Sequence, residues 1–246
     1  MKSHSLLLAL LFFAAPACNS LSNKPEHEVD KNTVAHLSET EQKEIREAQT
    51  QEAKARDQLA AAKVATDGAK NDLKVAKQEL EVADAEVKKT ELNMTAAETG
   101  TTESVDKARA AHSEALTLPA AARGRIALRE RQIDRSHARE DLASRRVELT
   151  MVSVELERAK AVNTLDRPNA KKVDVASYER DVRRAEEAVS LARVKLEAAG
   201  KETEIARTAY KVRVEAIPAS YRAAWRDDFA EDRTKEALDL EEEMRQ

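Results

Sequence analysis

An unbroken apolar repeat between Ile45 and Ala97 restricts the fold of this chain more than any other feature. Its members are spaced three and then four residues apart, at Ile45, Ala48, Glu52, Ala55, Leu59, Ala62, Thr66, Ala69, Leu73, Ala76, Leu80, Ala83, Val87, Thr90, Met94 and Ala97. All are apolar except Glu52, Thr66 and Thr90. A mean spacing of 3.5 residues kept over this length predicts a coiled-coil seam, since it holds one stripe of a helix against a partner helix.

Small residues alternate with large ones along this seam. Every second member is alanine, with Thr90 as the exception, and the others are mostly Leu, Ile, Val or Met. Small side chains repeated every seven residues let the backbone of a partner helix approach closely. The pattern resembles the alanine-rich antiparallel helix pairs called Alacoils. That resemblance implies a hairpin within one chain rather than a parallel zipper, which prefers bulky residues at both positions.

Composition and chain breakers extend this prediction to the rest of the chain. Charged residues make up 36% and aromatic residues 3% of the sequence, with only 4 Gly and 5 Pro, as is typical of long helices. Gly100 and Pro168 mark loops, and Leu118–Pro119 marks a kink or break. We expect an all-α protein, an elongated antiparallel helical hairpin or a three- to four-helix coiled-coil rod. Its long helices would span 38–98, 104–162 and 172–216, followed over 218–246 by a C-terminal helix with an acidic tail.

The N-terminal stretch has the three parts of a secretory signal peptide. A basic Lys2 precedes the apolar run 6–15, and small residues follow it in "LLLALLFFAAPACNS". We therefore expect a signal peptide over 1–17. The apolar run is shorter than the roughly 20 residues that span a bilayer. No later stretch is longer, so no transmembrane helix is predicted.

The only cysteine, Cys18, directly follows these small residues. This arrangement resembles the lipobox of bacterial lipoproteins, although Ala15 stands where that family prefers Leu, and Pro16 is unusual. The resemblance implies cleavage after Ala17, acylation of Cys18 and a bacterial cell-envelope location. Because Asn19 is not the Asp that retains lipoproteins at the inner membrane, it also favours the outer membrane, facing the periplasm. The alternative is ordinary secretion, which would leave a free thiol.

The polar stretch 18–37 contains Pro25 and has no apolar period, so we interpret it as a flexible tether behind the lipid anchor. His27 and His36 belong to this stretch, and we expect solvated side chains rather than metal ligands there. With the remaining histidines they make no paired metal spacing.

Two clusters are candidates for interaction. Arginines are dense between 123 and 146, and Arg131, Arg135 and Arg139 would form an anion-binding face. The favoured alternative is pairing with acidic residues of the chain itself. Aromatic residues recur every four residues at Tyr221, Trp225 and Phe229, which suits either a docking surface or packing on the bundle, the latter being favoured.

The sequence contains no catalytic constellation, phosphate-binding loop or metal motif, so we expect neither an enzyme nor a cofactor. A net charge of −4 with mixed signs argues against nucleic-acid binding.

The leading hypothesis is a membrane-anchored structural spacer or scaffold with an envelope protein as partner, and a homo-oligomer stays open. The alternative is a stand-alone hairpin that docks on an envelope channel or transporter. The stretch 138–150, "AREDLASRRVELT", resembles the hairpins of periplasmic efflux adaptors, without their β-rich segments. A periplasmic holdase is a third hypothesis, disfavoured by polar helix tips.

Overall fold

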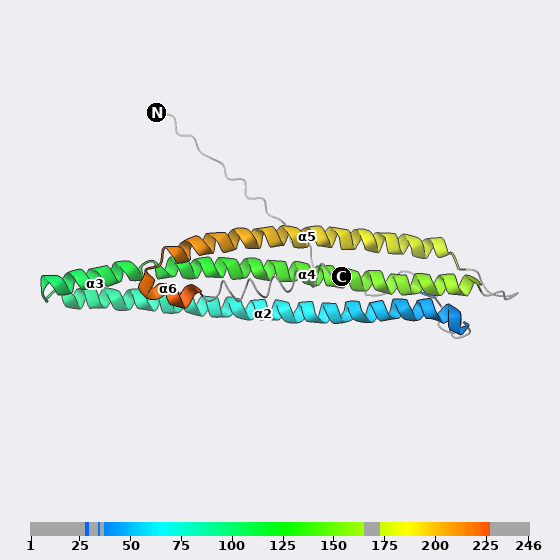
Figure 1. Cartoon of the computed structure of the whole chain (residues 1–246), viewed down its shortest axis with the longest axis horizontal. Helices are drawn as coiled ribbons and strands as arrows, with labels where there is room; N and C mark the ends of the chain where they lie inside the picture. Colours follow the sequence, from blue (N-terminus) through cyan, green and yellow to red (C-terminus); the bar gives the residue numbers. More distant parts are fainter. Residues whose placement is uncertain (1–27, 30–33, 35–36, 165–172, 227–246) are drawn as a thin grey trace, which may run out of the picture.

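The described part of the chain is an elongated all-α rod, which confirms the predicted fold class. A computed structural model describes residues 28–29, 34, 37–164 and 173–226. Its helices are α2 (Glu39–Ala97), α3 (Thr102–Ala115), α4 (Leu118–Thr164), α5 (Val175–Glu215) and α6 (Ala219–Arg226). At 1.5 Å per residue, the 59 residues of α2 span about 90 Å, which sets the length of the rod (Figure 1).

The long helices form a layer with α4 in the middle. Helix α4 packs against α2 on one side and against α5 on the other, and α3 pairs with the end of α2 (Figure 1). Helix α4 runs antiparallel to both long neighbours. Its flanked position explains why residues 138–159 include no fully exposed side chain, although many are charged. The two outer helices, in contrast, each keep one face towards solvent.

The predicted seam of α2 is the face that packs. All of its members are buried or half-buried, and Ala55, Ala62, Ala76 and Ala83 are almost wholly buried. Thr66, only 1% exposed, occupies a seam position by donating its hydroxyl to the carbonyl of Ala62 at 3.0 Å. The alanine positions therefore set the close approach of α2 to the helices it contacts, as the sequence predicted.

Local chemistry explains where the helices begin and end. Thr101 caps α3 by accepting a hydrogen bond from the amide of Ser104 at 3.2 Å, and Asp174 caps α5 by accepting one from the amide of Ala176. Gly100 lies in the turn before α3, as predicted. Helix α2 begins at Glu39 and ends at Ala97, each within one residue of the predicted bounds 38–98.

The second long helix breaks slightly earlier than expected. Helix α3 ends at Ala115, and α4 begins at Leu118, so the predicted range 104–162 is divided at Leu116 and Thr117 rather than at Leu118–Pro119. Pro119 instead lies in the first turn of α4, where a missing backbone N–H leaves no helical hydrogen bond unmade. The break is local, because α3 and α4 both pack along α2.

Helices α4 and α5 approach each other closely at Gly124. A β-carbon placed there would lie 2.8 Å from Cδ of Arg213 and 3.3 Å from Cδ2 of Tyr210. Tyr210 is only 1% exposed and is among the largest fully buried side chains of the described residues. The absence of a side chain at Gly124 thus makes room for the α5 aromatic ring.

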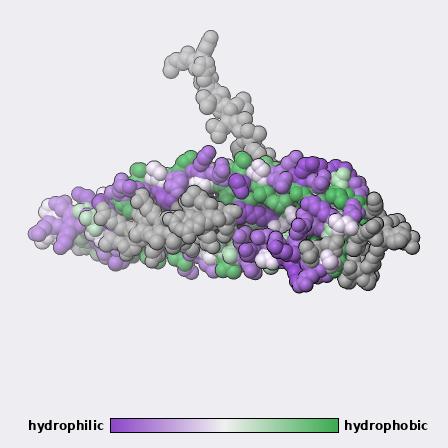
Figure 2. Space-filling model, turned by 45° about the vertical axis from the view of Figure 1, so that its right-hand side comes forward, coloured by the Kyte–Doolittle hydropathy of each residue, from purple (hydrophilic) through white to green (hydrophobic). Residues whose placement is uncertain are grey.

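Of the expected C-terminal helix over 218–246, the structure describes α6. Phe229 and the acidic tail lie outside the described residues. Surface hydropathy agrees with a narrow rod, because hydrophilic residues alternate with smaller hydrophobic patches over the face shown in Figure 2.

Candidate functional site

The segment before α2 packs onto one end of the rod. Val29 is 4% exposed and Leu37 is 6% exposed, and Val34 is half-buried. Val29 packs with Ala159 and Val162 of α4, where half-buried Val34 joins the same cluster. The interpretation of 18–37 as a flexible tether stays a prediction for the range as a whole. Of its described residues, Val29, Val34 and Leu37 have apolar side chains that are buried or half-buried against the bundle.

A buried carboxylate fixes this segment in place. Glu155 of α4 is 5% exposed, and its Oε2 accepts a hydrogen bond from the backbone N–H of Val29 at 2.8 Å. Arg158, one helical turn further along α4, donates to the other oxygen of the same carboxylate. A buried charge needs such partners, because an unpaired one would carry a large desolvation cost. Glu155 therefore joins two parts of the chain that are 126 residues apart.

Tyr178 of α5 borders the same cluster. Its ring packs with Val29 and Ala159 and is 7% exposed. Burial raises the pKa of Tyr178 above its ordinary value of 10.0, and the negative charges of Glu155 and Asp181 raise it further. The phenol is therefore neutral at physiological pH and serves this end of the rod through packing.

Sequence reasoning missed Glu155, although a signal was present. The residue lies three positions after Val152 and four before Ala159, a spacing that places all three side chains on one face of the helix. It therefore shares the packed face, where a carboxylate is unusual. The predicted anchor itself, Cys18 with the cleavage position Ala17, lies outside the described residues.

Several members of the arginine cluster are engaged within the rod. Arg125 donates to Glu79 of α2, and Arg129 lies 3.9 Å from the carboxylate of Asp72, also on α2. On the opposite side, Arg131 lies 3.3 Å from Glu202 of α5. Thus α4 presents cations to both neighbours, and the predicted alternative of pairing within the chain is confirmed for these three arginines.

The other two predicted arginines are also accounted for. Arg135 and Arg139 are half-buried, and each takes part in a polar interaction within the chain. Arg131 is the exposed member and additionally pairs with Asp134 at 3.1 Å. Of these three residues, Arg131 contacts a neighbouring helix, through Glu202 of α5. Their role in binding an external partner stays a prediction.

The aromatic residues near the C-terminus pack on the bundle. Tyr221 and Trp225 are half-buried beside the cluster formed by Ala83 of α2, Leu118 of α4 and Ile217. Trp225 also contacts the second cluster, formed by Leu128, Tyr210 and Val214. This confirms the packing alternative for Tyr221 and Trp225.

Within the described ranges, no group of three or more His, Cys, Asp or Glu side chains could hold a metal ion. His112 shares a hydrogen bond of 3.1 Å with the hydroxyl of Thr90, which ties α3 to α2. Among the described helices, none combines the length and the apolar character that a bilayer crossing requires.

Comparison with known protein families, with curated proteins and with solved structures finds no match to this chain. The class is therefore defined by the fold alone, as an elongated antiparallel all-α rod.

Proposed function

We propose that this protein is a lipid-anchored spacer or scaffold of the bacterial cell envelope. The observation that carries the proposal is the buried contact of Val29 and Leu37 at the end of the rod where α2 begins and α4 ends. The chain leading from Cys18 enters the rod at this end. An acyl anchor on Cys18 would therefore hold a rod of about 90 Å by one end. This arrangement suits a spacer or scaffold better than an enzyme.

Chain length limits how far the rod can lie from its anchor. Eleven peptide units separate Cys18 from Val29. At an extended rise of roughly 3.3–3.6 Å per residue they reach at most about 40 Å. Because Val29 is held by Glu155 and by apolar packing, this end stays close to the membrane. The turn at Gly100, at the other end, is then the part that can reach furthest.

Membrane fractionation tests the anchor. Wild-type protein should remain with the membranes and be released by detergent but not by high salt, whereas Cys18→Ala protein should become soluble. Ser20→Ala is a matched control and should behave as wild type. If the Cys18→Ala variant stayed with the membranes in the same proportion as wild type, the anchor and the proposed function would both fail.

Lipid-borne quenchers test which end faces the membrane. Single fluorophores at Lys43→Cys, near the start of α2, and at Thr99→Cys, in the α2–α3 turn, label opposite ends of the rod. Quenching should be strong at position 43 and weak at position 99. Equal quenching at both positions would indicate a rod lying along the membrane, which contradicts a spacer.

The hairpin alternative has one supporting observation of its own. Ile217, just after α5, packs beside Ala83 and Leu118, so beyond this level α3 pairs only with the last turns of α2 (Figure 1). The rod thus ends in a two-helix tip with polar residues at Glu98 and Thr101. If the tip docks on a channel or transporter, a photocrosslinker at Thr99 should capture that protein in cells, and one at Lys54 should not.

A further inference from the structure

The outer faces of α2 and α5 carry most of the exposed large apolar side chains of the described residues. Eight of them lie on these two helices, at Val64, Val75, Val82, Leu92, Leu191, Val194, Ile205 and Val212. On α2 each stands two residues after a member of the packed seam. On α5 each stands two residues after a buried or half-buried residue, at Val189, Ala192, Thr203 and Tyr210. Because a helix turns about 100° per residue, two residues place a side chain on the opposite face. Both helices therefore carry a second stripe that faces away from α4.

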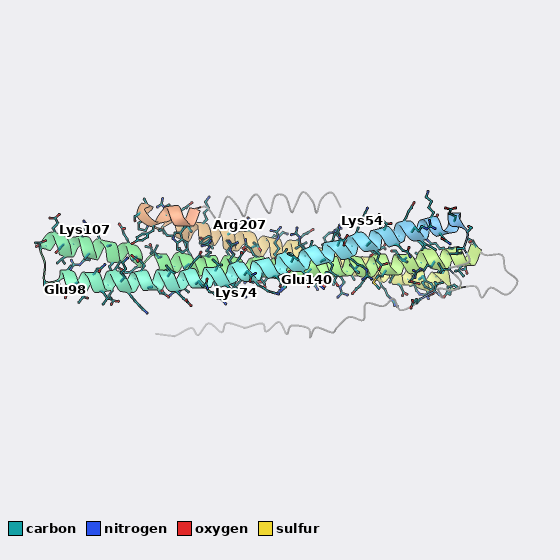
Figure 3. All side chains as sticks on the ribbon, turned by 90° about the horizontal axis from the view of Figure 1, so that it is seen from below. Lys54, Lys74, Glu98, Lys107, Glu140 and Arg207 are labelled. Atoms are coloured by element: carbon teal, nitrogen blue, oxygen red, sulfur yellow. The ribbon has the colours of Figure 1, made fainter. Side chains whose placement is uncertain are left out.

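On α2 this second stripe repeats as regularly as the seam. We define the outer stripe of α2 as Ala61, Val64, Gly68, Asn71, Val75, Gln78, Val82, Ala85, Lys89 and Leu92. Every member is exposed, with Val64 at 72% and Leu92 at 71%. No charge interrupts it before Lys89, whose ammonium pairs with Glu86 at 3.0 Å. Viewed from the α2 side, Figure 3 shows α2 with no described helix in front of it.

Charges beside the outer stripe alternate in sign every seven residues. They are Asp67, Lys74, Glu81 and Lys88, all exposed. If two copies of α2 pack antiparallel about a two-fold axis between Ala76 and Lys77, this row faces itself. In this register the flanking charge nearest to Asp67 is Lys88 of the second copy, and the one nearest to Lys74 is Glu81 of the second copy. The two-fold axis forms each of these pairs twice, so the row is complementary to itself.

The same register matches the stripe residues. Val75 meets Gln78 of the second copy, Gly68 meets Ala85, and the large Leu92 meets the small Ala61. Pairing small with large side chains lets two helices approach closely over about 48 Å. Two copies of α5 would complement each other less well through their exposed faces. Any antiparallel register that pairs Lys195 of one copy with Glu202 of the other also sets Glu197 against Glu204.

Acidic residues on the other flank of the stripe do not oppose this pairing strongly. Asp72 and Glu79 lie there, and both pair with arginines of α4, at Arg129 and Arg125. Their charges are thus partly neutralised within each copy. A parallel arrangement would instead set the alternating row against this occupied flank, which favours the antiparallel one.

We propose that the protein forms an antiparallel homodimer through the outer stripe of α2. A helix contact about 48 Å long and about 10 Å wide covers roughly 500 Å² per copy, less than the roughly 800 Å² of a standard interface. The dimer should therefore be reversible, with a dissociation constant in the micromolar range. This proposal is independent of the anchor at Cys18.

Sedimentation equilibrium of the full chain tests the dimer, in a Cys18→Ala background where neither an acyl chain nor a disulfide can cause association. Lys74→Glu and Glu81→Lys should each weaken the dimer about tenfold, because each turns two attractive contacts into repulsive ones. The double variant restores both pairs and should recover wild-type affinity. Lys107→Glu, an exposed lysine on α3 away from the stripe, should have no effect (Figure 3).

A second set of variants locates the contact. Val75→Lys should abolish the dimer while far-UV circular dichroism stays unchanged, because Val75 is 49% exposed in the single chain. Ile205→Lys, on the outer stripe of α5, should leave the dimer intact. A protein that is monomeric at hundreds of micromolar would overturn the proposal. So would a dimer that survives Val75→Lys and is lost with Ile205→Lys, or one that the double charge exchange fails to restore.

Discussion

Replacing two helical glycines by alanine should have different effects on stability. Gly68 lies on the exposed face of α2, and in the single chain a β-carbon there would meet no atom within 4 Å outside its own helical turns, so the comparison is made at concentrations below those at which the proposed dimer forms. Gly124 is buried between α4 and α5, where a β-carbon would meet Arg213 at 2.8 Å and Tyr210 at 3.3 Å. The same substitution thus tests the close approach of α4 and α5 against an internal reference.

The magnitudes follow from two competing terms. Alanine is favoured over glycine inside a helix by about 1 kcal/mol, so Gly68→Ala should raise the free energy of unfolding by about that amount. At Gly124 the same gain is offset by overpacking, which costs about 1–3 kcal/mol in a well-packed interior. Arg213 can move aside in part, but the ring of Tyr210 is buried. Gly124→Ala should therefore be about 1–3 kcal/mol less stable than Gly68→Ala.

Urea denaturation followed by circular dichroism at 222 nm measures this difference. In thermal unfolding, 1 kcal/mol corresponds to a shift of about 2–4 °C for a domain of this size. The midpoint should rise for Gly68→Ala and should stay level or fall for Gly124→Ala. If both variants gained the same stability, α4 and α5 would not approach closely at Gly124, and the assigned packing would be refuted.

Three further predictions concern the buried end and the seam. Glu155→Ala leaves the amide of Val29 without its buried acceptor, so the free energy of unfolding measured in urea should fall by about 1–3 kcal/mol. Proteases should also cleave the segment before α2 faster in this variant. Because burial and neighbouring carboxylates raise the pKa of Tyr178 above 10.0, the folded protein holds the phenolic proton more tightly. The free energy of unfolding should then fall as the pH rises above about 10, and Tyr178→Phe should remove that part of the fall in urea titrations at pH 9 and pH 11. Ala76→Leu, at a seam position only 1% exposed, should cost about 1–3 kcal/mol in thermal unfolding, whereas Ala53→Leu on the exposed side should stay within about 0.5 kcal/mol.

The long helices could be predicted because their information is local and repeated. The seam from Ile45 to Ala97 carries its period in every heptad, so one error in the pattern would not change the interpretation. Gly100 indicated the turn correctly, although none of the described glycines takes the left-handed conformation that favours glycine at a helix end. The break before α4 was placed slightly too late, since Pro119 is tolerated in the first turn of a helix and marks the start of α4 rather than the break itself.

The contacts between distant segments could not be predicted in the same way. The bond between Val29 and Glu155 joins residues 126 positions apart, and the segment around Val29 has no period to show which face it covers. The position of α4 between α2 and α5 could not be predicted either, because the charges along α4 do not show which helix pairs with which of them. Gly124 is a similar case, because only the position of Tyr210 explains it.

Intact mass spectrometry of the protein extracted from membranes tests the proposed function most directly. We expect the mature chain to begin at Cys18 and to carry the added mass of acyl chains, and we expect Cys18→Ala protein to lack this mass. An unmodified chain beginning at Cys18 would contradict the proposed function, because the rod would then be secreted with a free thiol instead of being held at a membrane.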